Sequence, residues 1–254
     1  MVESLLLGVV QGLTEFIPVS STAHLVLLHA LLGSTGPADS LAFDVALHFG
    51  TTAALVGFFW NDWIDILRNQ RALLYRIAAG TVPVAVAGLG ARHLISGALR
   101  SPALIAAMLV LFGMVMIASE RFRSDKPLHK MTVRDALLIG AAQALAVVPG
   151  VSRSGVAISA GLFAGYGRSD AARFAFLLST PAVLGAALLE SRDIWQGLDA
   201  APAVFAAGFV GSLLAGFAAL GFLMRYLQSH RLHGFAYYRF ALAAAIVAAL
   251  FFRG

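Results

Sequence analysis

The chain has 254 residues, of which 59% are apolar and only 12% are charged. Soluble domains carry about 25% charged residues, so lipid is the expected solvent for most of this surface. The net charge is +5, but no soluble segment combines a basic stripe with interleaved aromatic residues, so nucleic acid is not an expected partner. Cysteine is absent, which excludes disulfides, thiolate metal sites and cysteine nucleophiles.

Two apolar regions are interrupted near their centres. Residues 2–32 are broken at 17–22 (IPVSST), and residues 135–164 are broken at 149–154 (PGVSRS). Each half is shorter than the roughly 20 residues that a helix needs to cross a bilayer. The pattern predicts two re-entrant helix pairs, whose non-helical tips must be buried in protein or line a wet cavity.

Six further apolar runs have lengths close to a membrane span. They are 43–60, 74–91, 103–118, 173–189, 203–224 and 237–252. Three of them follow each broken region, and an odd number of crossings inverts the second half relative to the first. We therefore predict an all-α integral membrane protein with six transmembrane helices and two re-entrant pairs in an inverted-topology repeat, with a site near the middle of the membrane.

The repeat divides a single membrane domain, 1–254, into three parts. The first repeat covers about 1–118, a cytoplasmic connection covers about 119–134, and the second repeat covers about 135–254. The interrupted segments begin alike in the two repeats, with Gln11-Gly12-Leu13 in the first and Gln143-Ala144-Leu145 in the second.

Basic residues are divided unevenly between the predicted loops. Those assigned to one side lie mainly in 68–76, 121–134 and 168–173 and at Arg225, Arg231 and Arg239. Because arginine and lysine accumulate in cytoplasmic loops, this side is predicted to be cytoplasmic, with both termini outside. The first re-entrant pair would then open outward and the second inward, with their tips meeting near the membrane centre.

Glu15 lies deep in the first apolar region, four residues after Gln11, so both side chains project from one helical face. An ionisable side chain at this depth is costly and by default marks a functional site. The alternative is a structural carboxylate that pairs with Arg153.

The first break restarts a helix with three consecutive hydroxyl residues, Ser20, Ser21 and Thr22. Hydroxyls at this place can cap free backbone N–H groups, and a helix N-terminus is itself an anion site. His24 lies three residues after Ser21, on the same face and within reach of the same ligand. The alternative for His24 is a hydrogen-bonded packing role.

The second break repeats this design. Gly150 allows close approach of the backbone, Ser152 and Ser154 offer hydroxyls, and the forked donors of Arg153 suit phosphate oxygens. Together the breaks describe a site for a phosphorylated, lipid-linked ligand. They supply what phosphoryl transfer requires, which is charge neutralisation, an in-line nucleophile and an acid or base.

Asp44 and His48 form a weaker candidate, an i,i+4 pair near the start of the span 43–60. The pair is interpreted as a capping or interfacial contact. A role at the mouth of the site is the alternative.

Residues 11–24 (QGLTEFIPVSSTAH) resemble the first signature of the undecaprenyl-diphosphate phosphatase family, the BacA-type bacitracin-resistance proteins. Residues 149–155 (PGVSRSG) resemble the second signature, and the stretches 43–51 and 174–181 are also similar to the family. The resemblance implies hydrolysis of undecaprenyl diphosphate to undecaprenyl phosphate and inorganic phosphate at the outer face of the bacterial inner membrane. This reaction recycles the carrier lipid for peptidoglycan and other envelope polymers and confers bacitracin resistance.

The resemblance also implies roles for single residues. Glu15 matches the essential glutamate, Ser21 the proposed nucleophile, His24 the proposed acid/base and alternative nucleophile, and Arg153 the diphosphate-binding arginine. The other implied substrate-binding positions are Ser20, Thr22, Gly150, Ser152 and Ser154. Family members require a divalent cation, Mg²⁺ or Ca²⁺, for which Glu15 and Gln11 are the candidate ligands.

Three positions depart from the family pattern. Gln11 is uncharged where many relatives have a second carboxylate, Ala23 replaces a frequent glycine, and Ala157 stands where threonine is usual. Two rival functions remain. One is a transporter or flippase of the polyprenyl phosphate, because inverted repeats are also transporter architecture. The other is a non-catalytic lipid-binding paralogue, which the departures at Gln11 and Ala157 suggest. The Ser-Ser-Thr-x-His run favours the enzyme, because a carrier has no use for a nucleophile.

Overall fold

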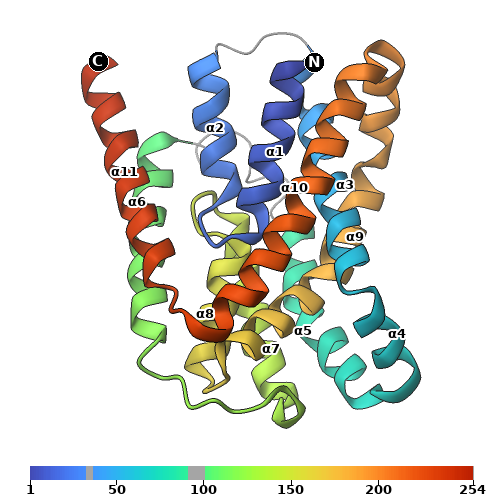
Figure 1. The fold of residues 1–254 in the computed structure, drawn as a ribbon, viewed down its shortest axis with the longest axis vertical. Helices are drawn as coiled ribbons and strands as arrows, with labels where there is room; N and C mark the ends of the chain where they lie inside the picture. The colour runs from blue at the N-terminus through green and yellow to red at the C-terminus, as the bar shows by residue number, and fades with distance from the viewer. Residues whose placement is uncertain (33–36, 91–100, 254) are drawn as a thin grey trace.

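The computed structural model describes residues 1–32, 37–90 and 101–253, and the regular elements in these ranges are all helices (Figure 1). Within these described ranges, five helices are long and apolar enough to cross a membrane. They are α5 (Arg71–Gly90), α6 (Pro102–Ser119), the first part of α9 (Arg168–Ala200), α10 (Pro202–Ser229) and α11 (His233–Arg253). Each overlaps a predicted span, so the prediction of an all-α membrane protein is confirmed.

The predicted span 43–60 is a bent pair of helices rather than one straight helix. α3 (Leu41–Phe58) is followed directly by α4 (Trp60–Asn69), at an angle of 57°. The apolar pattern ends at Asn61 and Asp62, and Ile66 is the one fully buried residue of α4. α4 therefore lies at the end of the bundle (Figure 1), where its polar side chains reach water.

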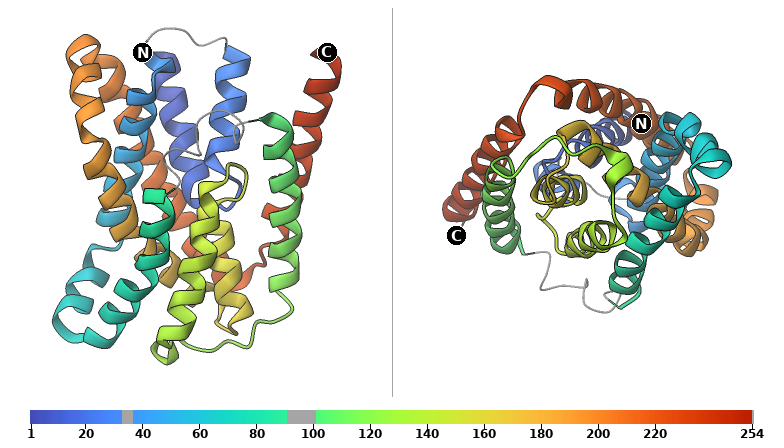
Figure 2. Two further views of the ribbon diagram at one scale, coloured as in Figure 1. Left: turned by 180° about the vertical axis from the view of Figure 1, so that it is seen from behind. Right: turned by 90° about the horizontal axis from the view of Figure 1, so that it is seen from below.

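Two helix hairpins occupy the middle of the bundle (Figure 2). α1 (Val2–Phe16) and α2 (Ser21–Leu32) form the first, and α7 (Val133–Ala144) and α8 (Arg153–Phe163) form the second. These helices have 15, 12, 12 and 11 residues, respectively, which is too short for a span of about 20 residues. The hairpins enter from opposite ends of the bundle, as expected of the predicted re-entrant pairs (Figure 1).

Proline determines where the first helix of each hairpin gives way to the tip. The ring of proline disfavours helical backbone at the preceding residue. Ile17, before Pro18, has ψ 133°, and Val148, before Pro149, has ψ 121°. The second break begins earlier than predicted, because α7 ends in a 3₁₀ turn, η5 (Leu145–Val147), of the kind that often tightens a helix end.

Close packing of α1 against α10 fixes the first hairpin. A Cβ atom added to Gly12 would lie 2.6 Å from the carbonyl oxygen of Ser212. One added to Gly216 would lie 3.0 Å from the ring of Phe16. Small residues at such a contact let helix backbones approach closely. The contact holds the last turns of α1 in a defined position.

The connections rich in basic residues share one end of the bundle, and both termini lie at the other end (Figure 1). At the first end Glu120 accepts hydrogen bonds from Nε of Arg168 at 2.9 Å and from the backbone N–H of Leu232 at 2.8 Å. Asp135 accepts from Lys126 at 2.8 Å and from the Tyr166 hydroxyl at 2.6 Å. These contacts tie the 119–134 connection to the loops before α9 and α11.

Candidate functional site

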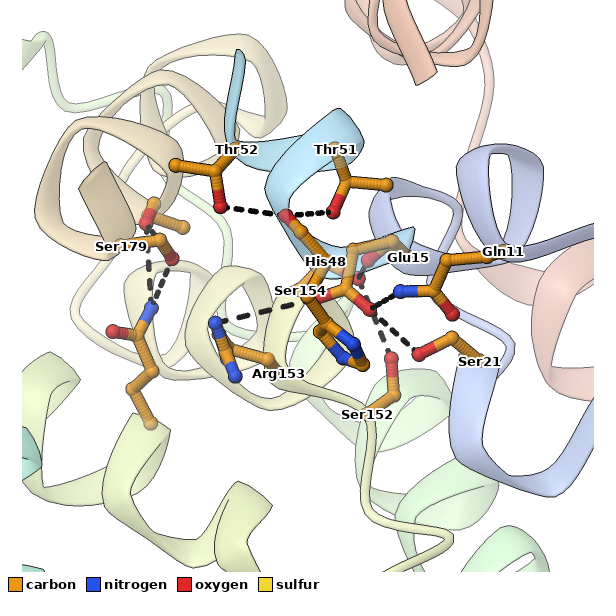
Figure 3. Close-up of polar contacts among 12 residues, drawn as sticks. Gln11, Glu15, Ser21, His48, Thr51, Thr52, Ser152, Arg153, Ser154 and Ser179 are labelled. Atoms are coloured by element: carbon orange, nitrogen blue, oxygen red, sulfur yellow. Dashed lines mark hydrogen bonds and ion pairs between the residues drawn. The ribbon is translucent and has the colours of Figure 1, made fainter. Parts of the chain in front are cut away.

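The tips of the two hairpins touch inside the bundle. The hydroxyl of Ser154 donates to the backbone carbonyl of Glu15 at 3.5 Å, across 139 residues of sequence. A Cβ atom added to Gly155 would lie 3.4 Å from Cβ of Pro18. The end of α1 and the start of α8 are therefore in contact, and the two broken motifs form one site (Figure 3).

Both tips enter their second helix through the same backbone conformation. Ser20, before α2, has φ 75°, and Ser152, before α8, has φ 71°. Residues other than glycine rarely adopt a positive φ, and such conformations cluster at binding and active sites. The two breaks, similar in sequence, are therefore also similar in backbone geometry.

Glu15 is the centre of the polar contacts (Figure 3). Its Oε2 accepts hydrogen bonds from the Ser21 hydroxyl at 2.6 Å and from Nε2 of Gln11 at 3.1 Å. Its Oε1 lies 4.0 Å from Nη1 of Arg153. The Glu15 side chain is 11% exposed, so this carboxylate is held by three partners in a largely dry setting, where charge-assisted hydrogen bonds are strong.

A small polar chamber of about 50 Å³ lies between the tips. All the predicted site residues of the two breaks line it except Gln11, His24 and Ser154, and His48 of α3 is also in its wall. A wider cavity of about 540 Å³ shares Glu15, His48 and Arg153 with the chamber. It extends between α2, α3 and α9 and is lined in part by apolar side chains, including Leu25, Val26, Val45, Val183 and Ala187.

The remaining predicted residues of the second break stabilise its shape. Ser152 caps α8, because its hydroxyl accepts from the Gly155 N–H at 3.3 Å, and it lies 3.3 Å from the hydroxyl of Ser154. Gly150 has φ 94°, and a Cβ there would lie 2.7 Å from the carbonyl oxygen of Ile105. A larger residue would be both strained and obstructed, so glycine is required at this position.

His24 is adjacent to the chamber but does not line it. Its Nδ1 lies 2.8 Å from the carbonyl oxygen of Ser20, and its Nε2 lies 2.7 Å from the hydroxyl of Tyr238. A carbonyl oxygen only accepts, so Nδ1 carries the proton and Nε2 accepts from Tyr238. Both ring nitrogens are thus occupied, which agrees with the hydrogen-bonded packing role that the sequence left open.

Arg239 is wrongly assigned by the charge pattern to a cytoplasmic loop. It lies within α11, is fully buried, and donates to five backbone carbonyls. Its partners are Pro18 in the first tip, Gly150 and Val151 in the second tip, and Met108 and Leu109 in α6. The sequence did contain a sign of this role. Arg239 lies inside the apolar run 237–252, and an arginine at such a position is costly unless it is paired or functional.

His48 is the second residue whose importance the sequence understated. It was interpreted as part of an interfacial pair with Asp44, but the structure places it in the walls of both the chamber and the wider cavity. The alternative role at the mouth of the site is therefore the one that agrees with its position.

The residues expected to bind a divalent cation do not form a cation site on their own. No group of three His, Asp or Glu residues that could hold a metal ion occurs in the described part of the chain. Glu15 Oε2 already accepts two hydrogen bonds. Gln11 turns its amide nitrogen to Glu15, and its buried Oε1 has no hydrogen-bond partner among the residues that the structure describes.

Like Gln11, the other two departures from the family pattern lie outside the chamber wall. Ala157 is fully buried in the main apolar core, among side chains such as Ile158 and Leu162. Ala23 is fully buried in a second apolar cluster with Leu109 and Ile246. Neither position contributes to the chamber wall, so the missing Thr at 157 does not remove a hydroxyl from it.

Fold and site together define an integral membrane protein with a buried polar site, in which two hairpin tips bring a hydroxyl, a carboxylate and a guanidinium together. The family described as "Bacitracin resistance protein BacA" matches residues 4–245. The chain belongs to this family.

Several curated relatives are similar over almost the entire chain. An undecaprenyl-diphosphatase of Thermodesulfovibrio yellowstonii is 44% identical over 252 residues, covering 99% of this chain and 98% of the relative. Proteins with the same name from Rubrobacter xylanophilus and Elusimicrobium minutum are 40% and 38% identical. They cover 98% and 97% of this chain, and 98% and 96% of their own lengths are matched.

Proposed function

We propose that this protein is an undecaprenyl-diphosphatase, which hydrolyses undecaprenyl diphosphate to undecaprenyl phosphate and inorganic phosphate. One observation carries the proposal: the Ser21 hydroxyl donates to Glu15 at 2.6 Å, beside Arg153, in a chamber that both broken motifs line. A hydroxyl on a carboxylate base, next to a forked cation, is the arrangement that nucleophilic phosphoryl transfer requires. The names of the relatives support the same reaction.

In the first step Glu15 accepts the proton of Ser21 while Ser21 Oγ attacks the distal phosphorus. The bond between that phosphorus and the bridging oxygen breaks, and undecaprenyl phosphate leaves with the electron pair. In the second step water attacks the phosphorus of the phosphoserine, and the bond between phosphorus and Ser21 Oγ breaks. The Glu15 proton returns to Ser21 Oγ, and inorganic phosphate departs as H₂PO₄⁻ with both protons of the attacking water. Ser21 is preferred to His24 as nucleophile because both nitrogens of His24 are engaged elsewhere.

Arg153 and the two helix N-termini supply the positive side of the site. The guanidinium fork suits phosphate oxygens, and the first N–H groups of α2 and α8 favour an anion. Ser20, Thr22, Gly150 and Ser152 line the same chamber, which supports their implied contact with the diphosphate. Ser154 does not line the chamber, and its hydrogen bond to the Glu15 carbonyl holds the two tips together.

The wider cavity offers a path for the start of the prenyl chain. It adjoins the chamber at Glu15, His48 and Arg153 and continues past apolar side chains of α2, α3 and α9. A lipid diphosphate has a polar end and an apolar chain, and the two cavities offer matching environments in that order.

We propose that the divalent cation, Mg²⁺ or Ca²⁺, arrives bound to oxygens of the diphosphate. The charges of Glu15 and Arg153 in the chamber wall cancel, whereas a diphosphate brings several negative charges. Mg²⁺ is commonly held by one or two protein oxygens together with substrate phosphates. A chelator should therefore abolish phosphate release, and added Mg²⁺ or Ca²⁺ should restore it.

We place the protein in the bacterial inner membrane with the first hairpin open to the outside. The proposal rests on the charge pattern, since the basic loops share one end of the bundle. The absence of cysteine makes the test simple. Ala203 lies at the start of α10, toward the end of the bundle that holds both chain termini. Ala203→Cys should react with an impermeant maleimide in whole spheroplasts, whereas Asn69→Cys should react only after lysis. The reverse labelling would overturn this orientation.

The deciding experiment measures phosphate release from a polyprenyl diphosphate by the detergent-purified protein and by Ser21→Ala and Glu15→Gln. We expect cation-dependent release that falls to background in Ser21→Ala. Ser159→Ala is the matched control, because Ser159 is also a buried serine of a hairpin helix but does not line the chamber. Its hydroxyl makes no hydrogen bond with any described residue. Lipid binding without release in the wild type would instead favour the carrier or the non-catalytic paralogue.

A further inference from the structure

The chamber wall has too little positive charge to balance the negative charge of a diphosphate. Among the described residues, its wall contains one carboxylate, Glu15, and one guanidinium, Arg153, whose Oε1 and Nη1 atoms lie 4.0 Å apart. The pair is neutral, so Arg153 is partly compensated before any ligand arrives. The other ionisable side chain in the chamber wall is that of His48.

His48 is held in a defined tautomer and orientation. Its Nδ1 lies 2.8 Å from the backbone carbonyl oxygen of Asp44. The carbonyl can only accept, so Nδ1 carries a proton, and Nε2 is the atom left for another partner. The imidazole makes no other hydrogen bond with the residues that the structure describes. In Figure 3 it points toward the space between Arg153 and Ser152.

The backbone around His48 is also fixed. Its carbonyl oxygen accepts from the hydroxyls of Thr51 at 2.9 Å and Thr52 at 2.7 Å. Gly50, two residues on, is buried against α10 and has no room for a Cβ atom, which would meet the Ser212 side chain. This turn of α3 is therefore anchored, and the imidazole is positioned before a ligand binds, which reduces the cost of binding.

His48 differs from His24, the other histidine near the tips, in the partners of its ring nitrogens. His24 has partners on both nitrogens and does not line the chamber. His48 has a partner on one nitrogen and lies in the chamber wall together with Glu15. In the described part of the chain, the other charged or titratable side chains that line the same two cavities are Glu15 of α1, His29 of α2, Arg153 of α8 and Asp39 just before α3, with Asp44 on the helix of His48 itself.

We propose that His48 is a substrate-binding residue, whose Nε2–H donates a hydrogen bond to the terminal phosphate as a second cation beside Arg153. Nδ1 stays on the Asp44 carbonyl, and Nε2 takes up one proton from water or from an acidic P–OH of the ligand. No covalent bond of the ligand changes in this step. The inference rests on the proposed function, because it names a further contact of the same site with a diphosphate.

The test uses full-length protein in detergent with inorganic pyrophosphate as the probe, measured by calorimetry, together with KM for a polyprenyl diphosphate. Wild type is compared with His48→Leu, which removes the donor, and with His48→Gln, which keeps an N–H donor but not the charge. His230→Gln, at the far end of the bundle, is the control for loss of an imidazole outside the site.

We expect His48→Leu to weaken pyrophosphate binding and raise KM by roughly 10- to 100-fold, the range for losing a hydrogen bond to a charged group. His48→Gln should lie between Leu and wild type. Pyrophosphate affinity equal to wild type in both variants would overturn the proposal. If His48→Leu does not fold, His48→Gln decides alone. A pyrophosphate affinity of His48→Gln equal to that of the wild type would show that a positive charge at position 48 contributes nothing to binding.

The two proposals fail in different ways. If the wild type binds pyrophosphate through His48 but releases no phosphate from a polyprenyl diphosphate, the enzymatic function is overturned and the contact between His48 and the anion stands. If the wild type releases phosphate and His48→Leu has the same KM, the function stands and the contact between His48 and the phosphate is overturned.

Discussion

Nη2 of Arg239 lies 2.7 Å from the carbonyl oxygen of Gly150, although 89 residues separate them in the sequence. The same guanidinium also reaches the Val151 carbonyl at 3.1 Å and the Pro18 carbonyl at 3.5 Å. One side chain from α11 therefore satisfies backbone acceptors in both hairpin tips. Buried carbonyls without a donor are costly, so the hydrogen bonds from Arg239 offset the cost of bringing the two tips together inside the bundle.

Replacing Arg239 should affect stability and activity together. Arg239→Met leaves several buried carbonyls unpaired, and we expect a loss of at least about 3 kcal/mol in the free energy of unfolding. Arg239→Lys keeps the charge but not the planar fork, and should recover only part of the loss. Thermal unfolding in detergent and phosphate release check this. Arg225→Met, on α10, is the control, and a stable, fully active Arg239→Met would contradict the positioning role.

Glu15→Gln should lower phosphate release by about 10²- to 10⁴-fold, the range for losing a general base. The amide keeps the size of the side chain and can still accept a hydrogen bond from Ser21, so the fold should persist. The measurement is the rate of phosphate release alongside the unfolding temperature. A rate within a fewfold of wild type would remove Glu15 from the proton transfer.

His24 should respond to substitution as a positioning residue. His24→Asn can still donate to the Ser20 carbonyl, in place of Nδ1, whereas His24→Leu cannot. We expect the asparagine variant to retain more activity than the leucine variant, and Tyr238→Phe to cost about 1 kcal/mol of stability, as for one hydrogen bond. The comparison of kcat for the two His24 variants is the measurement. Equal and complete inactivity, in variants that fold normally, would point to proton transfer by His24 itself.

Gly12→Leu should disrupt the packing of α1 on α10, because even a Cβ atom there lies 2.6 Å from the Ser212 carbonyl oxygen. Overpacking of this kind costs about 1–3 kcal/mol or more, and it would displace Glu15, less than one turn away. Gly88→Ala is the matched control, since nothing lies within 4 Å of an added Cβ there. The control should be neutral or slightly stabilising. Unfolding temperatures of the two variants decide.

Acid should weaken the loop end of the bundle through Asp135. Burial alone would raise the pKa of Asp135, but hydrogen bonds from Lys126, Tyr166 and Thr132 lower it from 3.8 to about 2. A carboxyl group with a lowered pKa stabilises the fold above its unfolded pKa, and this contribution is lost as pH falls from about 4 through 2. Asp135→Asn should therefore be less stable than wild type at pH 7 and show a flatter acid limb in thermal unfolding. Asp125→Asn, in an exposed ion pair, should change little.

Much of the fold could be predicted because its strongest determinants are local. Pro18 and Pro149 remove helical backbone at the residue before them, so both breaks were visible in the sequence, as were the apolar runs. The bend after Phe58 was missed because run length alone does not reveal where a helix changes direction.

The candidate site could be predicted in composition but not in arrangement. Glu15, Ser21 and Arg153 were identified because polar groups are rare in apolar runs. Which imidazole faces the chamber depends on the rotation of α2 and α3 about their axes, and tertiary packing sets that rotation. His24 was therefore favoured over His48. Arg239 was assigned to a loop because charge counting does not distinguish a buried arginine from an exposed one.

The bonds from Arg239 to both tips have a consequence for biosynthesis. Every residue of the predicted site precedes α11 in the chain, so the ribosome completes the chamber residues before the group that holds the tips together has been made. A nascent chain that ends before position 239 carries the nucleophile, the carboxylate and Arg153, yet its tip carbonyls have no guanidinium to bind. Activity should accordingly appear late in synthesis, only once α11 has inserted and Arg239 has bound the carbonyls of both tips.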